Sequence, residues 1–75
     1  MNEAEVILQQ LDDLTGQIYG GSSYRKLKTP FAKLVVQLAL ADPEFREIAT
    51  RTPGKVKHVT FVREWLRRRF NARPR

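Results

Sequence analysis

The residues best suited to chemistry in this chain are the cations of its last third. Residues 51–75 hold nine lysines and arginines against one acidic residue, Glu64. Cationic side chains contact the phosphate oxygens of nucleic acids, and each contact adds a salt-dependent increment to affinity. The candidate nucleic-acid-binding residues are Lys55, Lys57, His58, Thr60, Arg63, Arg67, Arg68, Arg73 and Arg75.

The run of three arginines at 67–69 has two explanations. The C-terminal end of a helix carries partial negative charge, so it favours cations for structural reasons alone. Three arginines in succession exceed what this effect requires, which favours phosphate contact for Arg67 and Arg68. Arg69 is expected to project toward the apolar side of the helix, where its methylenes can pack.

Two aromatic residues, Phe61 and Trp65, lie among these cations. Aromatic rings stack on unpaired bases in proteins that bind single strands or RNA. Their spacing of four residues is also typical of the buried side of a helix, and we favour that interpretation. For Tyr19 and Tyr24, packing in the core and exposure to solvent are equally expected.

The sequence offers little for catalysis or for a metal. His58 is the only histidine, and no carboxylate or cysteine stands at a ligand spacing from it, so we expect no metal and no cofactor. Asp12 and Asp13 are adjacent and would point about 100° apart on a helix, which prevents them from acting as a pair. No serine has the setting of a nucleophile. We therefore expect that the protein is not an enzyme.

Charge is segregated along the chain. The total is +6, but residues 1–15 hold four acidic residues and no basic one, whereas residues 51–75 carry a net charge of +8. A protein that needed only solubility would mix the two signs. The segregation indicates a polyanionic partner, or an acidic arm that meets the basic end of a second subunit.

Length and composition predict one small helical domain over residues 1–75. A chain of 75 residues without cysteine buries only about 60% of its unfolded surface, so good helix packing or self-association must add stability. Its longest nearly apolar run, 34–41, is too short to cross a membrane, and no targeting segment is visible. We expect a cytoplasmic protein without a membrane partner.

Residues typical of helix ends indicate where the helices of this chain begin and end. Apolar spacing predicts a helix over residues 3–19, capped by Asn2 and ended by Gly20 and Gly21. Thr29 and Pro30 are typical of a second helix start, and the apolar residues that follow lie all round that helix, which predicts a central, buried element.

The second half of the chain is expected to form two more helices. Asp42 and Pro43 start a third, short helix that residues 52–54 end. A last helix is expected from Lys57 to Phe70, with residues 71–75 as a frayed basic tail. The predicted fold class is all-α: a compact bundle of three to four helices, with a candidate helix-turn-helix formed by the last two.

The helix-turn-helix interpretation rests on the junction between the third and last helices, near Ala49. Such a unit needs a small residue where its helices cross, a turn of three or four residues, and a second helix that is apolar inside and polar outside. Ala49, the Pro53–Gly54 turn and the basic last helix fit those needs, and the second helix of such a unit lies in the major groove. An ordinary helical corner would share these features.

Two functions follow from this pattern. The first is a small nucleic-acid-binding protein, most simply a helix-turn-helix regulator or accessory factor that binds DNA rather than RNA as a homodimer. The second is a protein-binding helical module, an accessory subunit or inhibitor, that docks its basic last helix on an acidic protein. Trp65, Phe61 and the arginines are residue types enriched in binding hot spots, so they support the second function as well.

Overall fold

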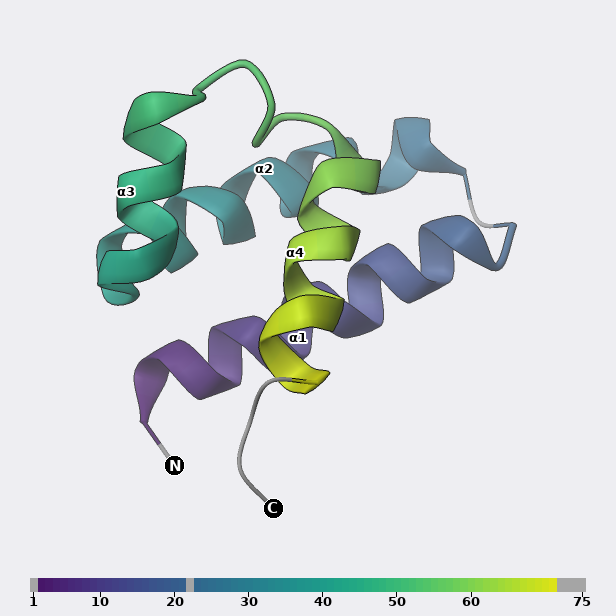
Figure 1. The fold of residues 1–75 in the computed structure, drawn as a ribbon. Helices are drawn as coiled ribbons and strands as arrows, with labels where there is room; N and C mark the ends of the chain where they lie inside the picture. The colour runs from purple at the N-terminus through teal and green to yellow at the C-terminus, as the bar shows by residue number, and fades with distance from the viewer. Residues whose placement is uncertain (1, 22, 72–75) are drawn as a thin grey trace.

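The structure, a computed structural model, describes residues 2–21 and 23–71. These residues form four α-helices and no strand: α1 Glu3–Tyr19, α2 Tyr24–Ala41, α3 Pro43–Arg51 and α4 Val59–Asn71. α1 and α2 form a helical hairpin, α3 packs on α2, and α4 crosses in front of α1 (Figure 1). The all-α fold class is confirmed. None of the four helices is long and apolar enough to span a bilayer.

The first helix begins and ends where the sequence predicts. The side chain of Asn2 accepts a hydrogen bond from the Glu5 N–H at 2.8 Å, which caps the helix start. At the other end, the Gly20 N–H donates to the Gly16 carbonyl at 2.9 Å. Gly21 follows with a φ of 105°, a left-handed conformation that glycine adopts without steric cost.

The second helix begins earlier than predicted. It starts at Tyr24, with Ser23 before it, and it continues through Pro30. The expected start at Thr29 was therefore wrong. Leu27 packs against the core one turn before the buried Phe31, so the helical spacing of core residues extends across the proline. The free energy gained from this burial offsets the loss of the hydrogen bond that proline cannot donate.

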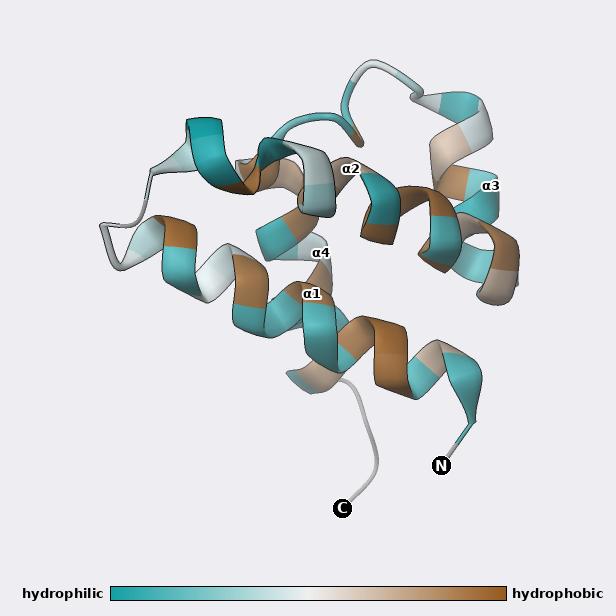
Figure 2. Cartoon of the chain, turned by 180° about the vertical axis from the view of Figure 1, so that it is seen from behind, coloured by the Kyte–Doolittle hydropathy of each residue, from teal (hydrophilic) through white to brown (hydrophobic). Residues whose placement is uncertain are grey.

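The prediction that this helix is central and buried was also wrong. Phe31, Val35 and Leu38 are buried, but Val36 is 59% exposed and Leu40 is 72% exposed. Among the four described helices, only α1 and α3 have Cα atoms within 8 Å of α2, so one side of α2 is not covered by any of them. Hydrophobic residues recur along α2 in the view from behind, where α1 and α2 lie nearest the viewer (Figure 2).

The third helix has the predicted start. A side-chain oxygen of Asp42 accepts a hydrogen bond from the Phe45 N–H at 3.1 Å, and Pro43 occupies the first turn. At the other end the Thr52 N–H bonds to the Ile48 carbonyl at 2.8 Å. The helix then stops at Arg51, before the Pro53–Gly54 pair, as the sequence predicts.

One hydrophobic core joins the four helices and orients α4. Phe45 of α3 and Trp65 of α4 meet at its centre, with ring centroids 4.9 Å apart in an edge-to-face arrangement. Trp65 is only 5% exposed, so its assignment to the core is confirmed. The buried apolar residues are Ile7, Leu8, Leu11, Leu14, Phe31, Val35, Leu38, Phe45, Val56, Val62, Trp65 and Leu66.

Candidate nucleic-acid interface

The junction between α3 and α4 differs from the tight turn expected of a helix-turn-helix. The connection spans residues 52–58, and no Cα atom of α3 lies within 8 Å of a Cα atom of α4. The two helices meet instead through the large rings of Phe45 and Trp65, which hold the backbones apart. The prediction that the last two helices cross closely at Ala49 was therefore wrong.

The connection presents cations because a valine between two lysines is buried. Val56 is 7% exposed and packs into the core, and its neighbours Lys55 and Lys57 are exposed. Two turns shape this segment: the Lys55 N–H bonds to the Thr52 carbonyl, and the His58 N–H to the Lys55 carbonyl, each at 3.0 Å. The alternation of apolar and basic residues thus places both lysines in solvent.

The last helix starts two residues later than predicted, at Val59. His58 stands directly before it, and its carbonyl accepts the bond from the Val62 N–H at 3.1 Å. Lys57 and His58 were expected to point outward from the first turn of this helix. They lie in the connection instead, where both are exposed beside the helix start.

Arg63 faces the protein rather than solvent. Its Nη1 donates to the Asp12 carbonyl at 3.2 Å and to the Thr15 hydroxyl at 3.1 Å, and it lies 3.6 Å from an Asp12 carboxylate oxygen. Its guanidinium also sits over the Tyr19 ring, 5.6 Å from the centroid. Arg63 therefore attaches α4 to α1, and only 21% of its side chain is exposed.

Thr60 is attached to the same part of α1. The Tyr19 hydroxyl donates a hydrogen bond to the Thr60 hydroxyl at 3.0 Å. Tyr19 is 55% exposed even so, and Tyr24 is 40% exposed, which decides a question that the sequence left open. The start of α4 is thus held by side-chain contacts with the end of α1.

Arg69 also has a structural role. Its Nη1 lies 3.0 Å from a carboxylate oxygen of Asp42, whose side chain is only 3% exposed, and 3.2 Å from a carboxylate oxygen of Glu44. Its guanidinium lies 5.6 Å from the centre of the Trp65 ring. The expected position of Arg69 on the apolar side is confirmed, but its ion pairs with the start of α3 were not predicted.

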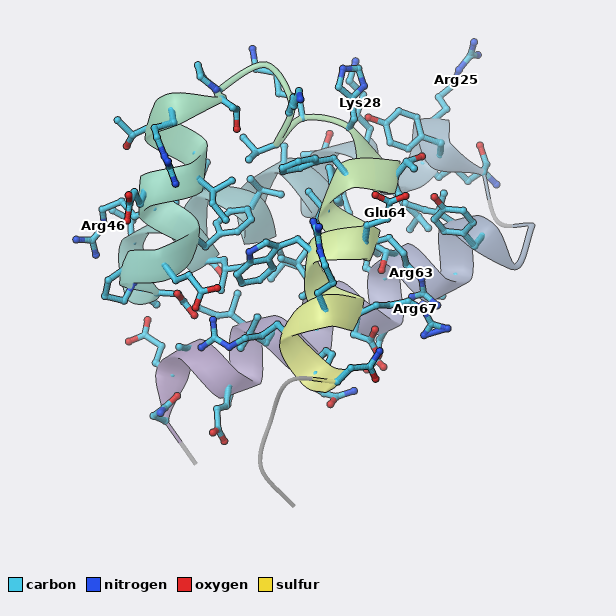
Figure 3. All side chains as sticks on the ribbon, in the orientation of Figure 1. Arg25, Lys28, Arg46, Arg63, Glu64 and Arg67 are labelled. Atoms are coloured by element: carbon cyan, nitrogen blue, oxygen red, sulfur yellow. The ribbon has the colours of Figure 1, made fainter. Side chains whose placement is uncertain are left out.

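Arg67 and Arg68 differ from both of these arginines. Both are exposed, and neither side chain makes a hydrogen bond or an ion pair with the part of the chain that the structure describes. They lie on the outer face of α4, which consists of its exposed residues Thr60, Glu64, Arg67, Arg68 and Asn71. Arg63, Glu64 and Arg67 project from α4, and Arg46 lies on the far side of the molecule on α3 (Figure 3).

Sequence reasoning missed a cation that the fold adds to this region. Lys28 of α2 lines one groove together with Lys57 of the connection. Figure 3 shows Lys28 and Arg25 at the same end of the molecule. The basic stretch 25–28 was a visible signal, but the predicted start of the second helix at Thr29 placed it outside any helix. Its place beside Lys57 depends on how α2 packs.

Two predicted residues, Arg73 and Arg75, lie outside the described residues. Within residues 2–21 and 23–71, no group of three or more histidine or carboxylate side chains is arranged to hold a metal ion. Comparison of the chain with models of protein families, with curated proteins and with solved structures gave no match. A function for this interface can therefore be argued only from its own chemistry.

Proposed function

We propose that this chain is a small nucleic-acid-binding protein that contacts duplex DNA through the outer face of α4 and the connection 52–58. The observation that carries the proposal is the contrast among the arginines of α4. Arg63 and Arg69 are bonded internally, whereas Arg67 and Arg68 are exposed without a partner in the described chain. Side chains with no structural role of their own are available to contact phosphates.

The shape of this surface favours duplex DNA over RNA. α4 has 13 residues and lies at one side of the molecule, in front of α1 (Figure 1). The major groove of B-form DNA, about 12 Å wide, admits an α-helix, whereas the major groove of A-form RNA is too narrow for side chains to read. Glu64 lies on the same face and would repel phosphates. It therefore belongs over the base edges, where a carboxylate accepts from cytosine.

The residues divide into two groups with different roles. Arg67 and Arg68 on α4, with Lys55 and Lys57 before it, supply sequence-independent contacts to the backbone. Thr60 and His58 flank the helix start and contribute less, because the Thr60 hydroxyl already accepts a hydrogen bond from Tyr19. Binding should therefore depend strongly on salt and only modestly on sequence.

Burial of the aromatic residues makes the protein-docking alternative weaker for this helix. Hot spots in protein interfaces centre on aromatic and arginine anchors that are free to enter a partner. Trp65 is 5% exposed and Phe61 is partly buried against the core, so neither ring is available on the outer face. What remains on that face is charged and polar, which suits a polyanion better than a shaped protein site.

A homodimer remains part of this proposal. One copy of so small a domain covers little DNA, and a symmetric pair would place two α4 helices on a two-part site. Sedimentation of the protein with and without a duplex would measure the stoichiometry. A ratio of two protein chains to one duplex supports the dimer, and a ratio of one to one contradicts it.

Fluorescence anisotropy with labelled random duplex DNA, single-stranded DNA and an RNA hairpin tests the proposal. Arg67→Ala and Arg68→Ala should each weaken duplex binding about five- to tenfold at 0.1 M salt, because one phosphate contact contributes about 0.9 to the salt slope. Lys33→Ala is the matched control: it removes the same charge from an exposed residue in a groove between α1 and α2. Equal losses for the three variants would contradict a specific role for the outer face of α4.

A further inference from the structure

An apolar groove lies between α2 and the connection 52–58, apart from the outer face of α4. It has a volume of about 330 Å³, which falls within the range of sites that hold a ligand or an anchoring side chain. Buried Phe31, Val35 and Val56 contribute to its lining, together with the exposed residues Tyr24 and Val36. None of these five side chains is proposed to contact DNA.

Exposed apolar residues continue along α2 from this groove. Val36 is 59% exposed, and Leu40, one helical turn further along α2, is 72% exposed. Exposed Ala32 lies one turn before Val36 and also lines the groove. Residues four apart share one side of a helix, so α2 carries an apolar stripe from Ala32 to Leu40 that none of the described helices covers. A contiguous exposed apolar surface marks an interaction site.

The charge at the groove decides which partner fits. Its lining includes two exposed lysines, Lys28 from α2 and Lys57 from the connection, and no acidic residue among those that the structure describes. Two copies packed groove against groove would bring these lysines together and would repel each other. Nucleic acid would match the lysines but not the apolar lining. A partner must therefore supply apolar anchors and carboxylates together.

We propose that this groove binds an amphipathic helix from an acidic partner protein. Apolar side chains of that helix at positions i, i+3 or i+4, and i+7 would lie along the stripe of α2, with one of them in the groove. Flanking carboxylates would pair with Lys28 and Lys57. Lys57 is shared with the proposed DNA contact, but this proposal does not rest on DNA binding, because the stripe and the outer face of α4 share no residue.

Titration with designed helical peptides of about four turns tests the proposal. The first peptide, labelled with a fluorophore, carries leucines at i, i+3, i+4 and i+7 with glutamates beside them. A second peptide has lysines in place of the glutamates. The full chain should bind the acidic peptide at least tenfold more tightly than the basic one, and amide shifts in an NMR titration should centre on Val36 and Val56.

Val36→Glu and Val6→Glu form a matched pair of variants. Both replace an exposed valine by a carboxylate, but Val6 lies on α1 and does not line the groove. Val36→Glu should weaken binding of the acidic peptide at least tenfold. Val6→Glu should leave the affinity for that peptide within about twofold of wild type. Circular dichroism on both variants checks that the fold is intact.

Three outcomes would overturn the proposal. The first is that neither peptide binds at millimolar concentration. The second is that the acidic and basic peptides bind equally, which would mean that Lys28 and Lys57 do not select the partner. The third is that Val36→Glu and Val6→Glu behave alike. DNA affinity measured on the same variants separates this proposal from the previous one, because neither valine lies on the outer face of α4.

Discussion

Replacing Arg69 by methionine should destabilise the protein, whereas the same change at Arg67 should not. Methionine keeps an apolar side chain over Trp65 but removes the cation that lies 3.0 Å from the buried carboxylate of Asp42. Arg67, two residues earlier on the same helix, has no such partner in the described chain. The two variants lose the same charge, so any difference in stability comes from the internal contacts of Arg69.

The expected cost lies between those of buried and exposed ion pairs. Breaking a fully buried pair costs about 3–5 kcal/mol, and an exposed pair is worth about 0–1 kcal/mol. The side chain of Asp42 is 3% exposed and that of Arg69 is 31% exposed. The Asp42 carboxylate also keeps its hydrogen bond from the Phe45 N–H. We therefore expect Arg69→Met to lower the free energy of unfolding by about 2–3 kcal/mol, and Arg67→Met by less than about 0.5 kcal/mol.

Urea denaturation followed by circular dichroism measures both values. For a domain of this size, the expected loss for Arg69→Met corresponds to a fall in Tm of roughly 10–20 °C. A double-mutant cycle with Asp42→Asn isolates the ion pair, because asparagine retains an oxygen that can cap α3. In the Asp42→Asn background, Arg69→Met should cost less than about 1 kcal/mol. Equal stabilities of Arg67→Met and Arg69→Met would refute the structural role of Arg69.

Three further changes test other parts of the structure. Pro30→Ala should raise the free energy of unfolding by about 1–3 kcal/mol, because it restores a hydrogen bond inside α2; an unchanged or lower value in urea would mean that the helix begins at Thr29 after all. Trp65→Ala should cost about 3–5 kcal/mol, and a stable variant that no longer binds DNA would contradict its place in the core. Arg63→Met should cost about 1–2 kcal/mol in thermal unfolding, because oxygens on α1 lose their donor. Its DNA affinity should match that of Lys33→Met, since neither residue is proposed to contact DNA.

Local signals predicted the elements whose ends are set by neighbouring residues. Asn2 caps α1 and Asp42 caps α3, as expected, because a cap involves residues only three positions apart. Burial of Trp65 followed in the same way from its spacing on one helix. The start of α2 was missed because proline usually marks a first turn, and the packing of Leu27 on the core outweighs that preference.

The local pattern placed Arg69 on the apolar side of α4, but it did not predict the ion pairs of Arg63 and Arg69. Arg63, Arg67 and Arg69 lie within seven residues of one helix, and charge alone does not separate them. What separates them is how α4 crosses α1 and meets the start of α3, which brings Asp12 to Arg63 and Asp42 to Arg69. These pairs join residues far apart in the chain, and their geometry exists only once the helices have packed.

The exposed side of α2 is a second feature that the sequence pattern could not predict. An all-round apolar pattern is typical of a buried helix, but burial on every side needs neighbours on every side. The described part of this chain has four helices, and α2 packs against α1 and α3 alone. Val36 and Leu40 are therefore left in solvent. The sequence pattern identified the apolar residues of α2 correctly but could not indicate which of them the fold leaves exposed.

The salt dependence of duplex DNA binding by the wild-type chain is the most direct test of the proposed function. Lys55, Lys57, Arg67 and Arg68 are exposed, so about four phosphate contacts should give a plot of log affinity against log salt with a slope of roughly −3 to −4. Contacts from Arg73 and Arg75 would make it steeper. Binding at low salt with such a slope is the predicted result. No binding at low salt, or a slope near zero, would contradict a phosphate-contacting role for this surface.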